Sequence, residues 1–222
     1  MATKNSRPTN DRDAISELTT GRLSVYLRCL TYLESVNQET ISSHELAERF
    51  HLNSAQIRKD LACFGEFGTR GVGYNVSELR SHLTRTLGID RVRNVVIIGA
   101  GNLGMALADY RGFNDNGFHI VALLDVDTDK IGRESRSGIP VLAYGELPRL
   151  VQKRGVEIGI IAVSAESAQQ VYDSLADAGV QAILNFAPVQ IRLKSDVKLK
   201  SVDLRINLES LSFYLKNVED GM

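Results

Sequence analysis

Apolar residues recur every three or four positions through the first third of the chain, which is the period of amphipathic helices. The first stretch predicts a long helix. Its apolar face would comprise Ile15, Leu18, Leu23, Tyr26, Leu27, Leu30 and Leu33. After a polar break at 37–40, Ser42 and Glu45 have the spacing of a capping box. A short second helix is therefore expected over Leu46, Ala47 and Phe50.

A third helix is expected to begin at Asn53 or Ser54, because Asn53 and Gln56 again have the spacing of an N-cap and its partner. Its buried stripe would comprise Ile57, Leu61 and Phe64, and its opposite face Ala55, Gln56, Arg58, Lys59 and Ala62. Only a tight turn fits between the second and third helices. The pair therefore has the pattern of a helix-turn-helix.

Four glycines lie within residues 65–74 and predict a hairpin rather than another helix. Phe67, Val72 and Tyr74 would form its short strands, with Arg70 near the tip. A linking helix should follow, capped by Ser77 and ended by Gly88. A helix-turn-helix followed by such a hairpin, or wing, predicts a winged-helix domain.

Beyond about residue 90 the pattern changes, because short apolar runs alternate with helical stretches. The runs are Val95–Ile98, Ile120–Leu124, Ile139–Leu142, Ile158–Val163 and Ala182–Phe186. This alternation predicts a parallel sheet with helices on both sides, as in a Rossmann-like domain. Near the end of the chain, an amphipathic helix is expected, with Leu204, Leu208, Leu211 and Leu215 on one face.

The chain has 222 residues, of which 43% are hydrophobic, enough for two domains with their own cores. We predict a winged-helix domain over 1–88, a Rossmann-type domain over 89–200 and a C-terminal dimerisation helix over 201–222. The formal net charge is −1, so any nucleic acid would be attracted only by local groups of charge. Neither a membrane span nor the apolar core of a signal peptide is visible, which predicts a cytoplasmic protein.

A glycine-rich turn directly follows the first apolar run of the second domain. It consists of Gly99, Ala100, Gly101, Asn102, Leu103 and Gly104. Gly99 would permit the tight bend, Gly101 would let the backbone approach a pyrophosphate, and Gly104 would allow close packing of helix on strand. The turn therefore predicts a dinucleotide site.

Asp125 ends the next predicted strand, about 20 residues beyond the turn. A carboxylate there accepts hydrogen bonds from the ribose hydroxyls and repels a 2′-phosphate, which favours NAD(H) over NADP(H). A surface turn residue is the alternative for Asp125. Ser164 follows the fourth predicted strand, and Asn185 lies near the end of the fifth. Ligands bind at these strand ends in such sheets, although either residue could be a loop cap.

The third helix carries residue types that suit the major groove of DNA. The candidate contacts are Ser54, Gln56, Arg58 and Lys59, with Arg70 of the wing placed for a minor groove. A solvated charged face and an exposed arginine in a glycine-rich turn are the plain alternatives. The order of helix, turn, helix and wing favours binding to DNA.

An NAD-dependent oxidoreductase with a helical N-terminal dimerisation domain is the main alternative, and a nucleotide-binding scaffold without a DNA role is another. No tyrosine is followed four residues later by a lysine, and three of the four histidines lie in the first domain. Cys29 and Cys63 have no metal-ligand spacing. We therefore predict no catalytic site and no metal site.

Several of these segments together resemble the bacterial redox-sensing transcriptional repressors of the Rex family. They are Ser54–Asp60, Phe64-Gly65, Gly68–Tyr74, Gly99–Gly104 with Ala106–Tyr110, Asp125–Asp127 and Asn185–Pro188. The resemblance runs from about Ile15 to Leu215 and is highly specific.

The resemblance implies a homodimer with C-terminal helices swapped between subunits. It would bind palindromic operator DNA when NADH is low and leave it when NADH binds, with NAD+ competing for the same site. The resemblance also implies that Arg28, Tyr110 and Asp203 form a switch that exchanges partners between the two states. Leu204 departs from family members that carry an aromatic residue against the nicotinamide.

Overall fold

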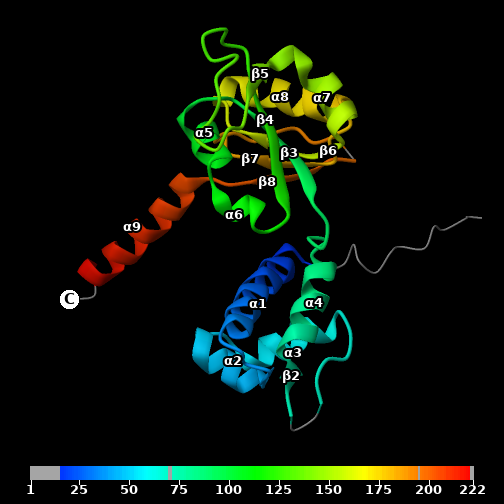
Figure 1. Cartoon of the computed structure of the whole chain (residues 1–222). Helices are drawn as coiled ribbons and strands as arrows, with labels where there is room; N and C mark the ends of the chain where they lie inside the picture. The colour runs from blue at the N-terminus through cyan, green and yellow to red at the C-terminus, as the bar shows by residue number, and fades with distance from the viewer. Residues whose placement is uncertain (1–15, 70–71, 195, 221–222) are drawn as a thin grey trace, which may run out of the picture. The chain divides into compact units, whose positions relative to one another are not determined.

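The computed structural model describes residues 16–69, 72–194 and 196–220. The chain divides into two compact units, Met1–Asp90 and Arg91–Met222 (Figure 1). No helix in these described ranges combines the length and the apolar character needed to cross a bilayer.

In its described residues, the first unit has four helices and a small two-stranded sheet. Its elements are α1 (Glu17–Ser35), β1 (Thr40–Ile41), α2 (Ser43–Phe50), α3 (Ser54–Ala62), β2 (Tyr74–Asn75) and α4 (Val76–Thr86). The predicted capping box of Ser42 and Glu45 starts α2, and the Asn53 side chain accepts from the Gln56 backbone at the start of α3. His51 ends α2 in the left-handed conformation, which makes the tight turn.

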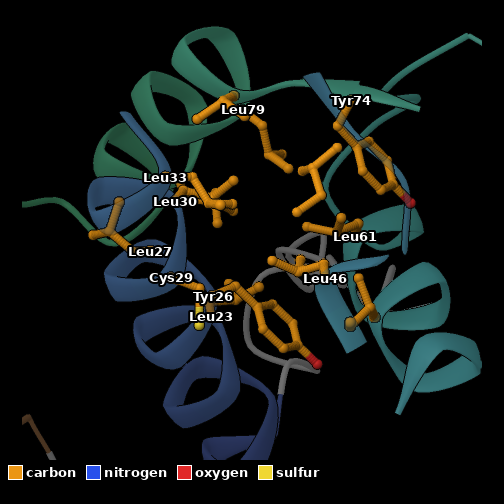
Figure 2. Packing of buried hydrophobic residues seen from close by; sticks show 14 of the residues in the cluster. Leu23, Tyr26, Leu27, Cys29, Leu30, Leu33, Leu46, Leu61, Tyr74 and Leu79 are labelled. Carbon is orange, nitrogen blue, oxygen red and sulfur yellow. The ribbon is translucent and has the colours of Figure 1, made fainter. Parts of the chain in front are cut away.

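One apolar core holds the first unit together. Figure 2 shows Leu23, Leu30 and Leu33 of α1 packed toward Leu46 of α2 and Leu61 of α3. These residues are at most 2% exposed, so the predicted faces of the helices are confirmed over most of their length. Leu18 was expected on the same face but is 75% exposed, because α1 first reaches the core one turn and more beyond it, at Leu23. Ile15 lies outside the described residues.

Two details of the hairpin and linking helix differ from the prediction. Phe67 and Val72 form no strand; the chain closes instead through a bridge between Thr69 and Gly73. The N-cap of α4 is Asn75 rather than Ser77, because the Asn75 side chain accepts from the Glu78 backbone. Gly88 has a positive φ of 65° and ends the helix region as expected.

The second unit contains a six-stranded parallel sheet in the order β5-β4-β3-β6-β7-β8. The strands are β3 (Arg93–Ile98), β4 (Phe118–Asp125), β5 (Val141–Ala143), β6 (Val156–Ile161), β7 (Ala182–Asn185) and β8 (Lys198–Ser201). This order is the doubly wound Rossmann arrangement, with its switch point between β3 and β6. Five strands match predicted runs, whereas β8 was missed.

Helices cover both faces of this sheet. They are α5 (Asn102–Ala108), α6 (Arg111–Asn114), α7 (Leu147–Arg154) and α8 (Ala165–Asp177). Val95 and Ile97 of β3 pack in the cluster that includes Ala108 of α5. Val96 and Ile98 belong to the cluster that includes Val151 of α7 and Val171 of α8. The strand is thus buried on both faces, as its unbroken apolar run predicts.

The last helix, α9 (Leu204–Asp220), follows β8. Its predicted apolar residues are all exposed, from 59% at Leu211 to 66% at Leu208 and Leu215. Phe213 and Tyr214 are exposed as well. A single chain therefore leaves a large apolar helix surface uncovered.

Candidate functional site

The glycine-rich turn connects β3 to α5, and its three glycines differ in the space that an added side chain would find. Gly99 has a φ of +104°, and a Cβ there would lie 2.5 Å from the Ala162 carbonyl oxygen. A Cβ on Gly104 would overlap the Gly99 carbonyl oxygen. At Gly101, by contrast, an added Cβ would meet nothing within 4 Å. Gly99 and Gly104 are therefore required by the fold, whereas Gly101 leaves open space beside the backbone.

Asp125 ends β4 next to this turn and is 9% exposed. One carboxylate oxygen accepts from the Ala100 backbone at 2.7 Å and from Lys130 Nζ at 3.3 Å. The other accepts from the Asp127 backbone at 2.9 Å. Burial acts to raise the pKa of Asp125, but these three hydrogen bonds outweigh it and lower the pKa. Asp125 is thus an ionised carboxylate that is tied to the turn.

A pocket of about 190 Å³ opens beside Asp125. It is lined in part by Gly99, Val126, Tyr144, Val163 and Gln170. The Tyr144 hydroxyl is buried and has no hydrogen-bond partner among the described residues. Tyr144 was not predicted from the sequence, because a tyrosine after the short strand β5 carries no motif. A pocket of this size is smaller than a whole cofactor site and suits one ring system.

Ser164 and Asn185 lie near the same edge of the sheet. Ser164 is exposed and is the N-cap residue of α8. Asn185 ends β7 and is fully buried; its side chain exchanges hydrogen bonds with the backbone of Ala187 and donates to Ser201 Oγ at 3.3 Å. The Asn185 side chain therefore shapes the loop after β7, the loop-cap role that the sequence left open.

In the first unit, α3 has a largely polar outer face. Ala55, Arg58, Lys59 and Ala62 are exposed, and Ser54 and Gln56 are partly exposed. Arg58 Nη1 donates to Ser43 Oγ of α2 at 2.9 Å. Arg70 lies outside the described residues. The expected face of α3 is thus exposed, and its arginine is held by the preceding helix.

A partly buried ion pair in the first unit, between Arg22 and Asp60, was not expected from the sequence. Asp60 of α3 is 2% exposed. Its carboxylate accepts from Arg22 Nε at 2.6 Å and Nη2 at 2.8 Å, from Tyr26 Oη at 2.9 Å, and from Gln56 Nε2 at 2.7 Å. The Arg22 hydrogen bond does most to lower the pKa of Asp60, burial opposes it, and Gln56 and Tyr26 add to the lowering. Burial and the bond to Asp60 raise the pKa of Tyr26.

The three expected switch residues lie at surface positions. Arg28 is exposed on α1, and Tyr110 is 58% exposed at the start of α6. The Tyr110 ring meets the Phe113 ring edge-on at 5.0 Å and leaves no room for a Cβ on Gly112. Asp203 is partly exposed and accepts from the Arg205 backbone at 2.9 Å, as a cap at the start of α9.

Two family models match the chain, one in each unit. A model described as putative DNA-binding protein N-terminus matches residues 14–62. A model described as CoA binding domain matches residues 90–189.

Relatives that span almost the whole chain identify the family. The redox-sensing transcriptional repressor Rex of Carboxydothermus hydrogenoformans is 50% identical over 202 residues, which cover 91% of this chain and 97% of the relative. A crystal structure of RSP in complex with beta-NAD+ and operator DNA matches with a TM-score of 0.87 and 37% identity, over 93% of this chain and 94% of that one. RSP in complex with beta-NADH matches with a TM-score of 0.81 and 36% identity, over 93% and 96%. The curated relatives are named as transcriptional repressors and not as enzymes. At this identity and coverage, the chain belongs to the Rex family of redox-sensing transcriptional repressors.

Proposed function

We propose that this protein is an NADH-responsive repressor that binds palindromic operator DNA when NADH is low and leaves it when NADH binds. NAD+ would compete for the same site without causing release. One combination carries the proposal: a dinucleotide-type turn at the switch point of a Rossmann sheet and a capped helix-turn-helix in one chain. Crystal structures of a similar protein hold NAD+ with operator DNA, and NADH.

The residues of the second unit fit a nicotinamide dinucleotide. The open space at Gly101 would admit a pyrophosphate beside the backbone, where a larger side chain would stand in the way. The Asp125 carboxylate, ionised at neutral pH, would accept hydrogen bonds from the ribose hydroxyls. The adjacent pocket would take the adenine ring, with the unpaired Tyr144 hydroxyl as a hydrogen-bonding group. Ala100, Asn102, Leu103, Gly104 and Ser164 would complete the site, and Asn185 would hold the loop.

The residues of the first unit fit duplex DNA. Gln56, Arg58 and Lys59 would donate to base edges or phosphates, while the small Ala55 and Ala62 let the helix approach closely. We further propose that Ser54 contacts the sugar-phosphate backbone of the DNA and that Arg70 enters a minor groove. Because DNA is the partner, the cytoplasm is the proposed location.

We also propose that the protein works as a homodimer. The uncovered apolar residues of α9 need a partner surface, and a second copy supplies one of the same kind. A twofold dimer would place two α3 helices on the two halves of a palindrome. We propose the domain limits that the sequence predicts: a DNA-binding domain over 1–88, a nucleotide-binding domain over 89–200 and a dimerisation helix over 201–222.

The two sites must be coupled if NADH is to release DNA. Arg28 on the first unit, Tyr110 on the second and Asp203 before α9 would form ion pairs and hydrogen bonds that differ between the two states. Coupling of this kind is typically about 1–3 kcal/mol, or about 5- to 150-fold in affinity.

Fluorescence anisotropy on a DNA duplex selected by the protein tests this function. We expect saturating NADH to weaken DNA binding at least about fivefold, whereas NAD+ at saturation leaves binding within twofold. Arg58→Ala with Lys59→Ala should remove DNA binding and leave NADH titration unchanged. Hydride transfer to small carbonyl compounds without any DNA binding would overturn the proposal. Ionic strength must be held constant, because phosphate contacts depend on salt.

A further inference from the structure

The Asp60 carboxylate connects α1 with the exposed face of α3. Four hydrogen bonds reach its two oxygens, two from Arg22 and one each from Tyr26 and Gln56. Arg22 and Tyr26 belong to α1 and lie more than thirty positions before Asp60, whereas Gln56 lies one turn before it on α3. Of the three residues that donate to Asp60, Gln56 is therefore the one on α3, the helix that also carries the exposed Arg58 and Lys59.

The chemistry of this contact settles the orientation of the Gln56 amide. An ionised carboxylate only accepts hydrogen bonds, so the Gln56 nitrogen rather than its oxygen must face Asp60. The lowered pKa of Asp60 keeps it ionised at neutral pH. The bond of 2.7 Å uses one hydrogen of the Gln56 amide. The carbonyl oxygen and the second N–H of Gln56 are left for another partner.

These two remaining groups match one base edge in the major groove. Adenine offers N7 as an acceptor and its N6 amino group as a donor, and glutamine pairs with both through its amide. Guanine offers two acceptors at the same edge, which a fixed amide oxygen would oppose. A fixed Gln56 amide therefore favours adenine over guanine.

We propose that Asp60 is a positioning residue for sequence recognition: by holding the Gln56 nitrogen, it presents the amide of Gln56 to an adenine in each half of the operator. Arg22 fixes Asp60 in turn through hydrogen bonds to both carboxylate oxygens, and so ties the recognising amide to α1. This inference rests on the proposed function, because it requires α3 to bind duplex DNA.

The test uses the full-length protein and a duplex recovered by the wild type from a random-sequence DNA pool. Each adenine of a half-site is replaced in turn by purine, which lacks the N6 amino group, and by 7-deazaadenine, which lacks N7. For the wild type we expect both analogues to weaken binding about tenfold or more at one position. We call these losses of DNA affinity the analogue penalties. Gln56→Ala should abolish both analogue penalties at that position and so identify it.

Asp60→Asn is the decisive variant, because an amide at 60 can donate and so lets the Gln56 oxygen turn toward it. We expect both analogue penalties to fall below twofold at the identified position and to persist at the other positions. Tyr26→Phe is the matched control: it removes one hydrogen bond from the same carboxylate but keeps the acceptor for Gln56. Its penalties should match those of the wild type.

Unchanged penalties in Asp60→Asn, or an equal loss at every position, would overturn the inference. Failure of the proposed function is distinct, because the wild type would then recover no sequence from the pool. If Asp60→Asn does not fold, NMR of the wild type without DNA decides. One side-chain amide proton of Gln56 should exchange with water at least tenfold more slowly than those of the exposed Gln152. Equal exchange at the two glutamines would refute the contact on which the inference depends.

Discussion

Replacing single glycines of the β3–α5 turn with alanine should separate folding from cofactor binding. At Gly104, the new methyl group would overlap the Gly99 carbonyl oxygen, which is backbone and has no side-chain torsion to relieve the contact. Overpacking of this kind costs about 1–3 kcal/mol or more. At Gly101, the methyl group would meet no described atom within 4 Å beyond its own residue and that residue's chain neighbours, and the φ of −80° suits any residue.

The two variants therefore have opposite expected profiles. Gly101→Ala gains about 0.4–1 kcal/mol from a less flexible unfolded chain and loses a comparable amount as a poorer N-cap. Its free energy of unfolding should change by less than about 1 kcal/mol. Gly104→Ala should lose about 3 kcal/mol, which corresponds to a Tm lower by about 6–12 °C for a chain of this size.

In Gly101→Ala, NADH binding should be weakened although the free energy of unfolding is nearly unchanged. A methyl group in the space proposed for the pyrophosphate should weaken NADH binding at least about tenfold, or about 1.4 kcal/mol. Thermal unfolding followed by circular dichroism, with NADH fluorescence titration on the same samples, measures both effects. Wild-type NADH affinity in Gly101→Ala would refute the placement of the cofactor. Wild-type stability in Gly104→Ala would refute the steric argument.

Three further predictions concern the other features. Because the folded-state pKa of Asp60 lies below the ordinary value of about 3.9, its contribution to stability is complete above about pH 4 and is lost as the pH falls toward the lowered pKa. Unfolding titrations at several pH values should show that the free energy of unfolding falls less steeply below about pH 4 in Asp60→Asn than in the wild type. An unchanged dependence on pH would contradict this. Leu208→Glu should turn a dimer into monomers in sedimentation while exposed Glu209→Gln does not; a dimeric Leu208→Glu would exclude α9 from the interface. Tyr110→Phe should reduce the NADH-induced loss of DNA affinity to below about threefold with NADH binding retained, and full NADH response would remove Tyr110 from the switch.

Local signals were enough to predict much of the fold. The caps of α2 and α3 depend on residues three positions apart, so Ser42, Glu45, Asn53 and Gln56 could be assigned from spacing alone. The central strands are buried on both faces and were visible as apolar runs. β8 was missed because Lys198–Ser201 is short and largely polar, and it becomes a strand only by pairing with β7 at the sheet edge.

The site was harder to predict where it depends on contacts between distant segments. Asp60 follows Arg58 and Lys59 and resembles an ordinary solvated residue of a helix. Its burial is decided by Arg22 and Tyr26 on α1, which the sequence of α3 does not contain. Tyr144 was missed for the same reason, because its pocket exists only once β3, β4 and α8 are assembled.

We propose that NADH and operator DNA favour different states of one protein. Calorimetric titration of NADH into the free protein and into the protein saturated with its selected duplex tests this claim most directly. Linkage requires that whatever NADH does to DNA affinity, DNA does to NADH affinity by the same factor. We expect NADH to bind the DNA-saturated protein at least about fivefold more weakly than the free protein. Equal NADH affinity in the two titrations would contradict the account.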